Sequence, residues 1–237
     1  MEQIDYEAKR NAEKEVAATT DLSVKRIKSR SNMLLYPFSK RSLDIAGSLM
    51  AIVIFSPLFF LISIFYLFEK RKGSIFFKQL RVGKNGEMFQ IYKFRSMAID
   101  AEERLKSDRI LYEKYIENNY KLEPEEDPRI TKLGAFLRKT SLDELPQFIN
   151  VLKGDMSLVG PRPVVEAELN EYGNKADLFL SVKPGVTGYW QVSGRSNIGY
   201  PQRVNLELEY VYKQSLLFDI KIIFKTFLIV FLKRGAY

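Results

Sequence analysis

The 237-residue sequence contains no cysteine and no histidine. Without cysteine the chain can form no disulfide framework and can use no thiolate chemistry. Without histidine it cannot assemble a Ser-His-Asp triad, a Cys-His pair or an ordinary His-rich zinc site. Any acid, base, nucleophile or metal ligand must therefore come from Asp, Glu, Lys, Tyr, Ser or Thr, and oxygen ligands favour Mg²⁺ or a similar hard ion.

Negative charge is the scarcer sign: 29 Asp and Glu residues face 37 Lys and Arg residues, which gives a formal charge of +8. This excess predicts an anionic partner. Composition alone leaves open whether that partner is nucleic acid, a lipid headgroup surface or a phosphorylated small molecule. The length allows one domain of comfortable size or two small ones.

The stretch from Ile45 to Phe68 carries no charged side chain. A straight helix of this length would reach roughly 36 Å, which is enough to cross a bilayer. Pro57 interrupts it, because proline removes the hydrogen bond to the carbonyl of Val53. The hydroxyl of Ser56 is placed to satisfy backbone groups that are freed in this way.

Basic residues flank the apolar stretch on both sides, with Lys40 and Arg41 before it and residues 70–72 after it. Basic residues favour the cytoplasmic side of a membrane. A re-entrant helix that breaks at Ser56-Pro57 and returns to the same face accommodates both groups. A Pro-kinked helix that crosses the membrane is the alternative.

Two segments after this stretch predict a β-hairpin. Residues 74–82 and 87–97 are rich in aromatic and β-branched side chains, and Asn85-Gly86 between them is a turn signal. The two-residue period of a strand places Lys93 and Arg95 on one face. A solvated strand edge protected by charge is the alternative interpretation.

Further along, the pattern predicts a polar helix at residues 100–121 and a short amphipathic helix at 129–139. The C-terminal residues 219–237 are apolar but are interrupted by Lys221 and Lys225. This pattern suits a helix that lies in the membrane interface, and an amphipathic helix of a soluble core is the alternative.

The stretch "KTSLDELPQ" places two carboxylates, Asp143 and Glu144, side by side. Ser141 and Glu144 have the spacing of a capping box, so an ordinary helix start is one interpretation. If Pro146 lies in the first turn, the helix begins near Asp143.

The helical period then places Asp143 on a polar stripe and Glu144 at the boundary of an apolar face. A carboxyl group at such a boundary tends toward a raised pKa, which is useful in an acid or a base. The predicted polar stripe is Asp143, Gln147 and Asn150, and the predicted buried face is Leu145, Phe148, Ile149 and Leu152.

Two more motifs concern anion binding. In "GDMSLVGPRPVV", Pro161 and Pro163 stiffen the backbone around Arg162, which suits bidentate capture of a phosphate. In "KPGVTGYWQVSGRSN", the glycines allow tight turns or close approach to a ligand, and Gln191 and Arg195 are candidates to contact a nucleotide. An ordinary surface loop is the alternative for each motif.

Together these residues resemble the bacterial monotopic phosphoglycosyl transferases, a family of bacterial sugar transferases. The resemblance rests on the stretches "KRSLDIAGS", "FSP", "IYKFRSM", "DPRITKLGAFLRKTSLDELPQFINVLKGDMSLVGPRP" and "KPGVTGYWQVSGR". These cover roughly four fifths of the chain, from about Lys40 to its end. Because a short tail replaces the multi-span domain of the long form, the chain resembles the compact catalytic unit.

The resemblance implies a two-step transfer of a sugar-1-phosphate from a UDP-sugar to polyprenyl (undecaprenyl) phosphate, with release of UMP. It implies that Asp143 is the nucleophile, that Glu144 completes the catalytic pair, and that Mg²⁺ binds near Asp143. The substrate-binding residues that it implies are Lys93, Arg95, Arg138, Arg162, Gln191 and Arg195. This reaction is the first membrane step of capsule, O-antigen, exopolysaccharide or glycoprotein glycan synthesis.

The predicted fold is a mainly helical α+β monotopic membrane protein with a re-entrant helix, a β-hairpin and interfacial helices. We predict a polar tail at residues 1–35, the membrane helix at 36–72, a cytosolic catalytic domain at 73–215, and a C-terminal interfacial helix at 216–237 that belongs to the same unit. The expected location is the cytoplasmic face of the bacterial inner membrane.

The expected partners are the UDP-sugar, the polyprenyl phosphate and the lipid bilayer, and a homodimer is one alternative for the oligomeric state. The sugar stays open among glucose, galactose and N-acetylated or modified hexoses. A different hypothesis is a membrane-tethered binding protein without catalysis. We expect no nucleic acid partner, since the aromatic residues form no obvious stacking platform.

Overall fold

The computed structural model describes residues 35–68, 73–117, 122, 126–194 and 198–231. Nearly all of the predicted tail, the basic residues 70–72 and Arg195 lie outside these ranges. The helices and strands, in chain order, are α2 (Leu35–Leu67), β1 (Phe76–Val82), the 3-10 helix η1 (Lys84–Gly86), β2 (Met88–Phe94), α3 (Ala101–Ser107), α4 (Arg109–Glu117), α5 (Lys132–Lys139), the 3-10 helix η2 (Leu142–Glu144), α6 (Gln147–Lys153), β3 (Ser157–Val159), the 3-10 helix η3 (Glu166–Lys175), α7 (Ala176–Phe179), β4 (Gly185–Thr187), α8 (Gln202–Lys213) and α9 (Leu216–Phe231).

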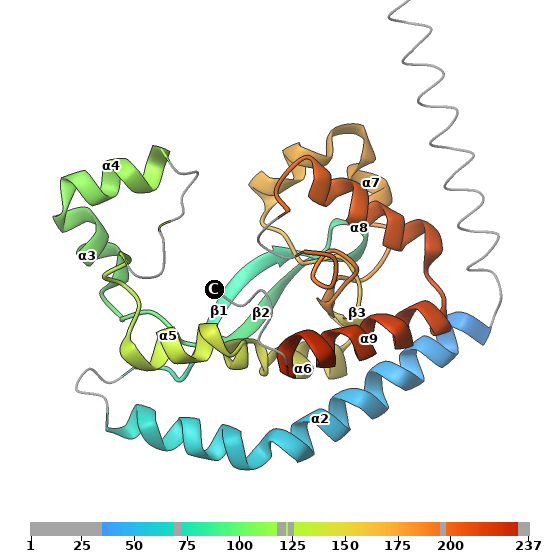
Figure 1. Ribbon diagram of the computed structural model, residues 1–237, viewed down its shortest axis with the longest axis horizontal. Coiled ribbons are helices and arrows are strands. Elements are labelled where there is room, and N and C mark those ends of the chain that lie inside the picture. The colour runs from blue at the N-terminus through green and yellow to red at the C-terminus, as the bar shows by residue number, and fades with distance from the viewer. Residues whose placement is uncertain (1–34, 69–72, 118–121, 123–125, 195–197, 232–237) are drawn as a thin grey trace, which may run out of the picture.

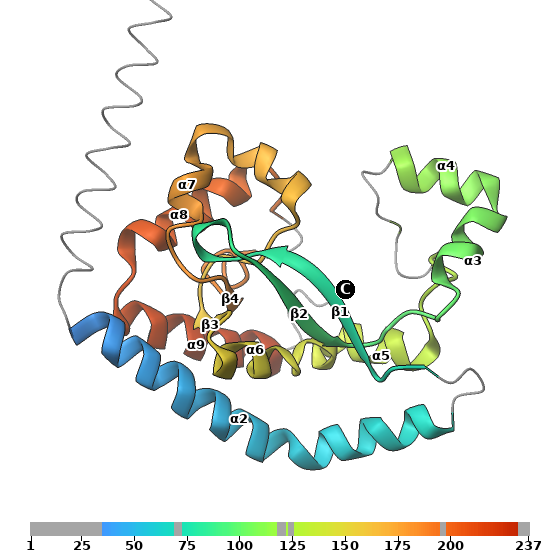
Figure 2. The same ribbon diagram turned by 180° about the vertical axis from the view of Figure 1, so that it is seen from behind.

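The described residues form a mainly helical α+β fold, as predicted. Figure 1 shows the β1–β2 hairpin at the centre and α2 along one edge, next to α5, α6 and α9. Helices α7 and α8 lie on the opposite side from α2, and α3 and α4 project as a separate arm, which Figure 2 shows from behind.

The predicted hairpin is confirmed. Strands β1 and β2 pair antiparallel, with Val82 opposite Met88. Asn85 and Gly86 both have positive φ, +58° and +83°, which is the turn conformation that Asn-Gly favours. This turn fixes the register, and the register decides which side chains of the two strands share a face.

A parallel pair of strands, β3 and β4, was not predicted from the sequence. Ser157 pairs with Gly185, and Val159 pairs with Thr187. A Cβ atom on Gly185 would lie 2.1 Å from the backbone nitrogen of Gly160, so only glycine allows this approach. Gly185 therefore serves the contact between two chain segments.

Helix α6 is attached to the hairpin by hydrogen bonds. The buried Asn150 accepts from the backbone N–H of Tyr92 (2.9 Å) and donates from its Nδ2 to the carbonyl of Gln90 (2.7 Å). The predicted buried face was wrong in part: Ile149 is exposed, and Gln147 is buried with Asn150. Since the polar stripe of α6 faces the strand, hydrogen bonds replace apolar burial there.

Helix α2 runs without interruption through Pro57, so the predicted break at Ser56-Pro57 was wrong. Figure 1 shows instead one helix that bends part-way along. The Ser56 hydroxyl donates to the carbonyl of Val53 at 2.8 Å, which confirms that it satisfies the acceptor that proline leaves free. One compensated hydrogen bond allows a bend without breaking the helix.

The first turns of α2 are attached to the rest of the fold by charged side chains. Lys40 pairs with the buried Asp219 of α9 (2.8 Å), and Arg41 donates to two carbonyls at the C-terminal end of α6 (2.6 and 2.8 Å). Asp44 accepts from the backbone N–H of Leu158 in β3 (2.8 Å). The basic residues before the apolar stretch therefore bind groups of α6 and α9.

The last turns of α2 are attached by apolar contacts. Ile62 and Tyr66 are buried in one cluster with Phe94 of β2 and Leu145, and the Tyr66 hydroxyl donates to the backbone carbonyl of Arg95. Both ends of α2 therefore contact the same body.

Between its two ends, α2 leaves most of its apolar surface uncovered. It is long and apolar enough to cross a membrane, yet only 11% of its most apolar 18-residue window is buried, unlike the core helix of a soluble protein. Such a surface marks a membrane or protein interface. The exposed large apolar side chains include Leu49, Met50, Val53, Ile54, Phe60, Leu61 and Phe65 on α2 and Leu217, Ile220, Phe224, Phe227, Leu228 and Val230 on α9.

The single helix predicted at residues 100–121 is split into α3 and α4 at Asp108. Asp108 has extended backbone angles (φ −107°, ψ 101°), and its carboxylate accepts from the N–H of Leu111 at 3.0 Å, as a helix cap does. The amphipathic helix predicted at 129–139 is confirmed as α5, which begins after Thr131.

Candidate active site

The turn that carries the two carboxylates is not a capped helix start. Ser141 has a left-handed backbone (φ 57°, ψ 19°) and its side chain makes no capping hydrogen bond, so the capping-box interpretation was wrong. Residues 142–144 form the short helix η2, and α6 begins only at Gln147, after Pro146. The left-handed residue reverses the chain after α5 and turns Asp143 inward.

The burial of the two carboxylates is the reverse of the prediction. Asp143 is 8% exposed, whereas the Glu144 side chain is 23% exposed. Burial, followed by the neighbouring charge of Glu144, raises the pKa of Asp143 from 3.8 to about 6, while Lys93, Arg138 and Arg162 act in the opposite direction. Sequence reasoning placed this effect on Glu144, because the helix was assumed to begin near Asp143.

No hydrogen bond to the Asp143 carboxylate is made within the part of the chain that the structure describes. A buried carboxylate in a folded protein is usually hydrogen-bonded. Asp143 is therefore a mostly buried carboxyl group that is surrounded by cations and whose oxygens are available to bond to another atom.

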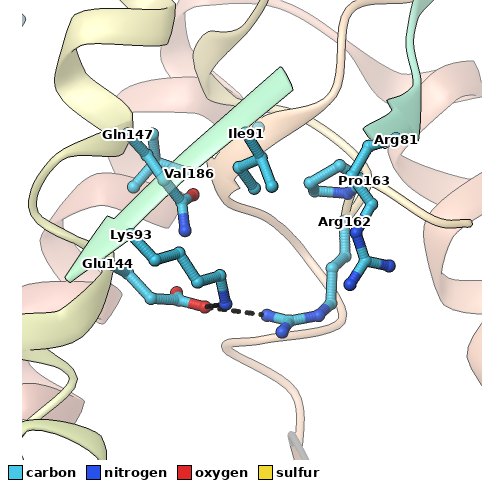
Figure 3. Close-up of a pocket in the computed structure, with 9 residues that line it drawn as sticks. Arg81, Ile91, Lys93, Glu144, Gln147, Arg162, Pro163 and Val186 are labelled. Atoms are coloured by element: carbon cyan, nitrogen blue, oxygen red, sulfur yellow. Dashed lines mark hydrogen bonds and ion pairs between the residues drawn. The ribbon is translucent and has the colours of Figure 1, made fainter. Parts of the chain in front are cut away.

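Glu144 holds two of the predicted cations. Lys93 Nζ lies 2.8 Å and Arg162 Nη1 3.5 Å from the same oxygen, Glu144 Oε1. Figure 3 shows the three side chains converging from β2, from η2 and from the loop after β3. They line a small pocket, together with Arg81, Ile91, Gln147, Pro163, Gly185 and Val186.

Arg138 approaches Asp143 from α5. Its Nε donates to the hydroxyl of Ser96 at 2.9 Å, and its charge lowers the pKa of Asp143. A Cβ atom on Gly134 would lie 1.8 Å from the carbonyl oxygen of Ser96, so α5 rests directly on the chain after β2. This contact fixes the position of Arg138.

The backbone of Arg162 is held from α8. Its N–H donates to Glu207 Oε1 at 3.2 Å, and Glu207 is 1% exposed. Glu207 also accepts from Arg203 Nε (3.2 Å) and from the Tyr172 hydroxyl. The stiffness that two prolines predict for this loop is thus reinforced by a buried ion pair.

Three predicted substrate-binding residues that the structure describes do not line the pocket: Arg138, Arg95 and Gln191. Arg95 lies at the end of β2, where its guanidinium is 5.3 Å from the centre of the Tyr66 ring of α2. Gln191 is buried against Gly188, because a Cβ atom there would lie 2.7 Å from Gln191 Oε1. Arg195 lies outside the described residues.

Arg81 and Gln147 line the pocket and were not predicted as site residues. The hairpin register would have identified Arg81, because Arg81 pairs with Phe89 and opposite residues share a face with Ile91 and Lys93. Gln147 was placed on the polar stripe of α6, but no sequence signal indicated that this stripe is buried.

The donor set for a metal ion is small. No group of three or more Asp, Glu, His or Cys side chains suited to a metal occurs among the described residues. Asp143 and Glu144 supply two neighbouring carboxylates. This set fits Mg²⁺, which often binds one or two carboxylates and completes its coordination with phosphate oxygens and water.

Comparison with known proteins gives the chain a family. A model of the bacterial sugar transferases matches residues 35–233. Over 204 residues the chain is 48% identical to an undecaprenyl-phosphate galactose phosphotransferase of Salmonella typhimurium, covering 84% of this chain and 42% of that protein. It is 37% identical to a UDP-glucose:undecaprenyl-phosphate glucose-1-phosphate transferase of Escherichia coli, of which it covers 41%.

The chain thus spans less than half the length of these two relatives. It is also 45% identical to the exopolysaccharide production protein ExoY of Rhizobium meliloti over 200 residues, covering 84% of this chain and 88% of ExoY. The matched region of the family model includes both carboxylates and every cation that surrounds them. The chain belongs to the bacterial sugar transferase family.

Proposed function

We propose that this protein transfers a sugar-1-phosphate from a UDP-sugar to polyprenyl (undecaprenyl) phosphate through a covalent intermediate on Asp143, and releases UMP. The observation that carries the proposal is the buried Asp143, which accepts no hydrogen bond from the described residues and is surrounded by Lys93, Arg138 and Arg162. The printed names of the Salmonella and E. coli relatives support the donor and acceptor classes.

In the first step an oxygen of Asp143 attacks the β-phosphorus of the UDP-sugar. The bond between the β-phosphorus and the oxygen that bridges the two phosphates breaks. A carboxylate needs no general base for this attack. Phosphoryl transfer depends mainly on position and on neutralised charge, which Lys93, Arg138 and Arg162 supply. Glu144 keeps Lys93 and Arg162 in place until the phosphates replace it as their partner.

In the second step an oxygen of the lipid phosphate attacks the same phosphorus and restores Asp143. The turn with Asp143 is next to the membrane helix, because its neighbours Leu142 and Leu145 pack in one cluster with Ile62 of α2. This packing supports a site that a lipid-borne phosphate reaches from the bilayer surface.

We propose Mg²⁺ as the cofactor, held by Asp143 with Glu144 beside it. When bound, the ion would neutralise charge on the phosphate oxygens. Without Mg²⁺, the cations around the pocket would leave part of the negative charge of the UDP-sugar phosphates uncompensated. Removal of Mg²⁺ with a chelator should therefore abolish turnover.

The proposed location is the cytoplasmic face of the bacterial inner membrane, with α2 as a re-entrant helix. A crossing helix would separate its ends by roughly 30 Å or more. Lys40 and Tyr66, near the two ends of α2, instead bind the same body. The bend in α2 and the uncovered apolar surfaces of α2 and α9 support insertion from one side.

Cysteine labelling tests this topology, because the native chain has no cysteine. Single cysteines at Ser39 and Ser74 should react with a membrane-impermeant reagent from the same side of sealed vesicles. Labelling from opposite sides would establish a crossing helix.

The activity is tested with purified protein, Mg²⁺ and a panel of UDP-sugars without the lipid. We expect UMP release and a phosphosugar adduct on Asp143 with the correct sugar, which also identifies the donor. Asp155→Asn is the matched control, because it changes another acidic residue a short distance further along the chain that does not line the pocket. Full activity in Asp143→Asn would exclude the covalent mechanism, and a binding protein would release no UMP with any donor.

A further inference from the structure

Arg81 is a cation of the pocket to which the mechanism above gives no role. It lies near the end of β1, and its side chain is 17% exposed. Figure 3 shows its guanidinium next to Arg162, at the end of the pocket away from Glu144. Burial, followed by the charge of Arg162, lowers its pKa, so two like charges are held close together in a shielded place.

The pocket has two distinct ends. Lys93, Glu144 and Gln147 are at one end, Arg81 and Pro163 are at the other, and Ile91 lies between them (Figure 3). The side chain of Arg162 reaches from the Arg81 end towards Glu144. Cations therefore line the pocket along its length, while Glu144, the carboxylate among its lining residues, is at one end.

The hydrogen bonds of Arg81 leave capacity for a ligand. Its Nη2 donates to Gln79 Oε1 (2.7 Å) and its Nη1 to Glu168 Oε1 (3.3 Å), while its buried Nε has no partner within the described residues. Glu168 also accepts from Tyr200 and Arg203 at its other oxygen. Glu168 would therefore remain bonded if Arg81 turned towards an anion.

The direction of phosphoryl transfer decides which anion that is. The attacking and leaving oxygens are roughly in line across the phosphorus, so the leaving group points away from the nucleophile. Asp143 does not line the pocket itself, but it precedes Glu144 in η2, and Lys93 and Arg162 are close enough to lower its pKa. It therefore lies by the Glu144 end. The departing phosphate must then point towards the end at which Arg81 lies.

We propose that Arg81 binds the α-phosphate of the UDP-sugar, the phosphate that departs with UMP. This inference rests on the proposed function. As the bond between the β-phosphorus and the bridging oxygen breaks, the electron pair stays on that oxygen, and UMP leaves with one more negative charge. The bond from the Asp143 oxygen to the β-phosphorus replaces the broken bond, and no proton has to move. Arg81 stabilises the charge that develops on the leaving phosphate.

The test compares UMP with uridine, which lacks the phosphate. Binding of each to the purified, detergent-solubilised protein is measured by calorimetry or by competition, with Mg²⁺ present. We expect Arg81→Gln to weaken UMP binding tenfold or more and to leave uridine binding unchanged. Arg81→Lys, which keeps the charge and is the milder change, should lose less.

Lys78→Gln is the matched control, because Lys78 is an exposed cation of the same strand and lies on the opposite face. It should bind UMP as the unmodified protein does. Thermal unfolding of each variant shows whether it is folded. If Arg81→Gln does not fold, the comparison of UMP with uridine is made with Arg81→Lys.

Three results would overturn the inference. Equal losses for UMP and uridine would mean that Arg81 only supports the structure, and unchanged UMP binding would mean that it contacts no phosphate. A raised KM for undecaprenyl phosphate with unchanged UMP binding would assign Arg81 to the lipid phosphate. The proposed function fails separately, if the unmodified protein releases no UMP from any UDP-sugar.

Discussion

Asp143 and Glu207 are both buried carboxylates, and burial is the main cause that raises the pKa of each. Glu207 accepts hydrogen bonds from Arg203, from Tyr172 and from the backbone of Arg162. Asp143 accepts none within the described residues, although three cations are close enough to lower its pKa. The same cost of burial is thus compensated by hydrogen bonds at Glu207 and left partly uncompensated at Asp143.

The difference shows how the fold separates a structural acid from the acid that we propose to be reactive. Hydrogen bonds to Glu207 use its oxygens and hold the Arg162 loop in place. The oxygens of Asp143 stay available, since its cations interact with it through space or bind Glu144 instead. Changes at the two acids should therefore alter the free energy of unfolding with opposite signs.

The largest expected effect is the loss of activity in Asp143→Asn, by at least about a thousandfold, because an amide is a poor nucleophile. The same variant should be more stable than the unmodified protein at pH 7.5, by about 1–2 kcal/mol, since a buried charge without hydrogen bonds has been removed. UMP release and chemical unfolding are the two measurements. A less stable Asp143→Asn protein would contradict the contrast with Glu207.

Changing Glu207 should have the opposite effect on stability. Glu207→Ala leaves Arg203 without its main partner in a buried place and should lose about 3–5 kcal/mol of unfolding free energy. Glu207→Gln keeps an acceptor and should lose about 1–3 kcal/mol, with a reduced kcat because the Arg162 loop is less well held. Glu209→Gln, in the same helix and in an exposed pair with Lys213, is the control and should change stability by less than about 1 kcal/mol.

The pH dependence should follow Asp143. Its folded pKa of about 6 means that the rate of adduct formation rises as the pH passes upward through that value, because the nucleophile must be ionised. The sign for stability is the reverse. Since the folded pKa is raised above the unfolded one, the folded state binds more protons, and this contribution to stability is lost between about pH 4 and pH 6.

Rapid-mix measurement of UMP release from pH 5 to pH 8 checks the predicted rise in the rate of adduct formation. Unfolding of the unmodified protein and of Asp143→Asn over pH 4–7 checks the predicted loss of stability. The stability advantage of Asp143→Asn over the unmodified protein should grow across that range. A rate that is constant from pH 5 to pH 8 would show that Asp143 is ionised throughout.

The smallest effect is expected at Ser141, just before the two acids. A true capping serine loses about 1 kcal/mol on change to alanine. Ser141 makes no capping bond and has a left-handed backbone, so Ser141→Gly should stabilise the protein by about 0.5–1 kcal/mol through relief of strain. Unfolding measurements that show a loss for Ser141→Gly would restore the capping interpretation.

Local patterns predicted the elements with strong local signals. Asn85-Gly86 predicted the hairpin, and its alternation placed Lys93 correctly on the face of the pocket. The prolines around Arg162 predicted a rigid cation. The split at Asp108 was missed, because a helix period alone does not show which capping residue interrupts it.

Long-range contacts could not be predicted in the same way. Lys40 and Arg41 were interpreted as flanking charges and instead bind α9 and α6. Ser141 was interpreted as a cap, since a left-handed serine is rare and leaves no sequence signal. Arg81 was missed because its role depends on a strand register and on a loop that lies more than seventy positions further along the chain.

By itself the sequence determined the chemistry that was available and predicted the surroundings of one helix. The absence of histidine and cysteine left oxygen nucleophiles and cations, and an uncharged stretch with a central Ser-Pro predicted a helix for a membrane surface. Only the tertiary structure decided which carboxylate is buried without hydrogen bonds from the described residues and which cations surround it. Burial and charge depend on side chains from β2, α5 and the loop after β3, and no local pattern records how these segments meet.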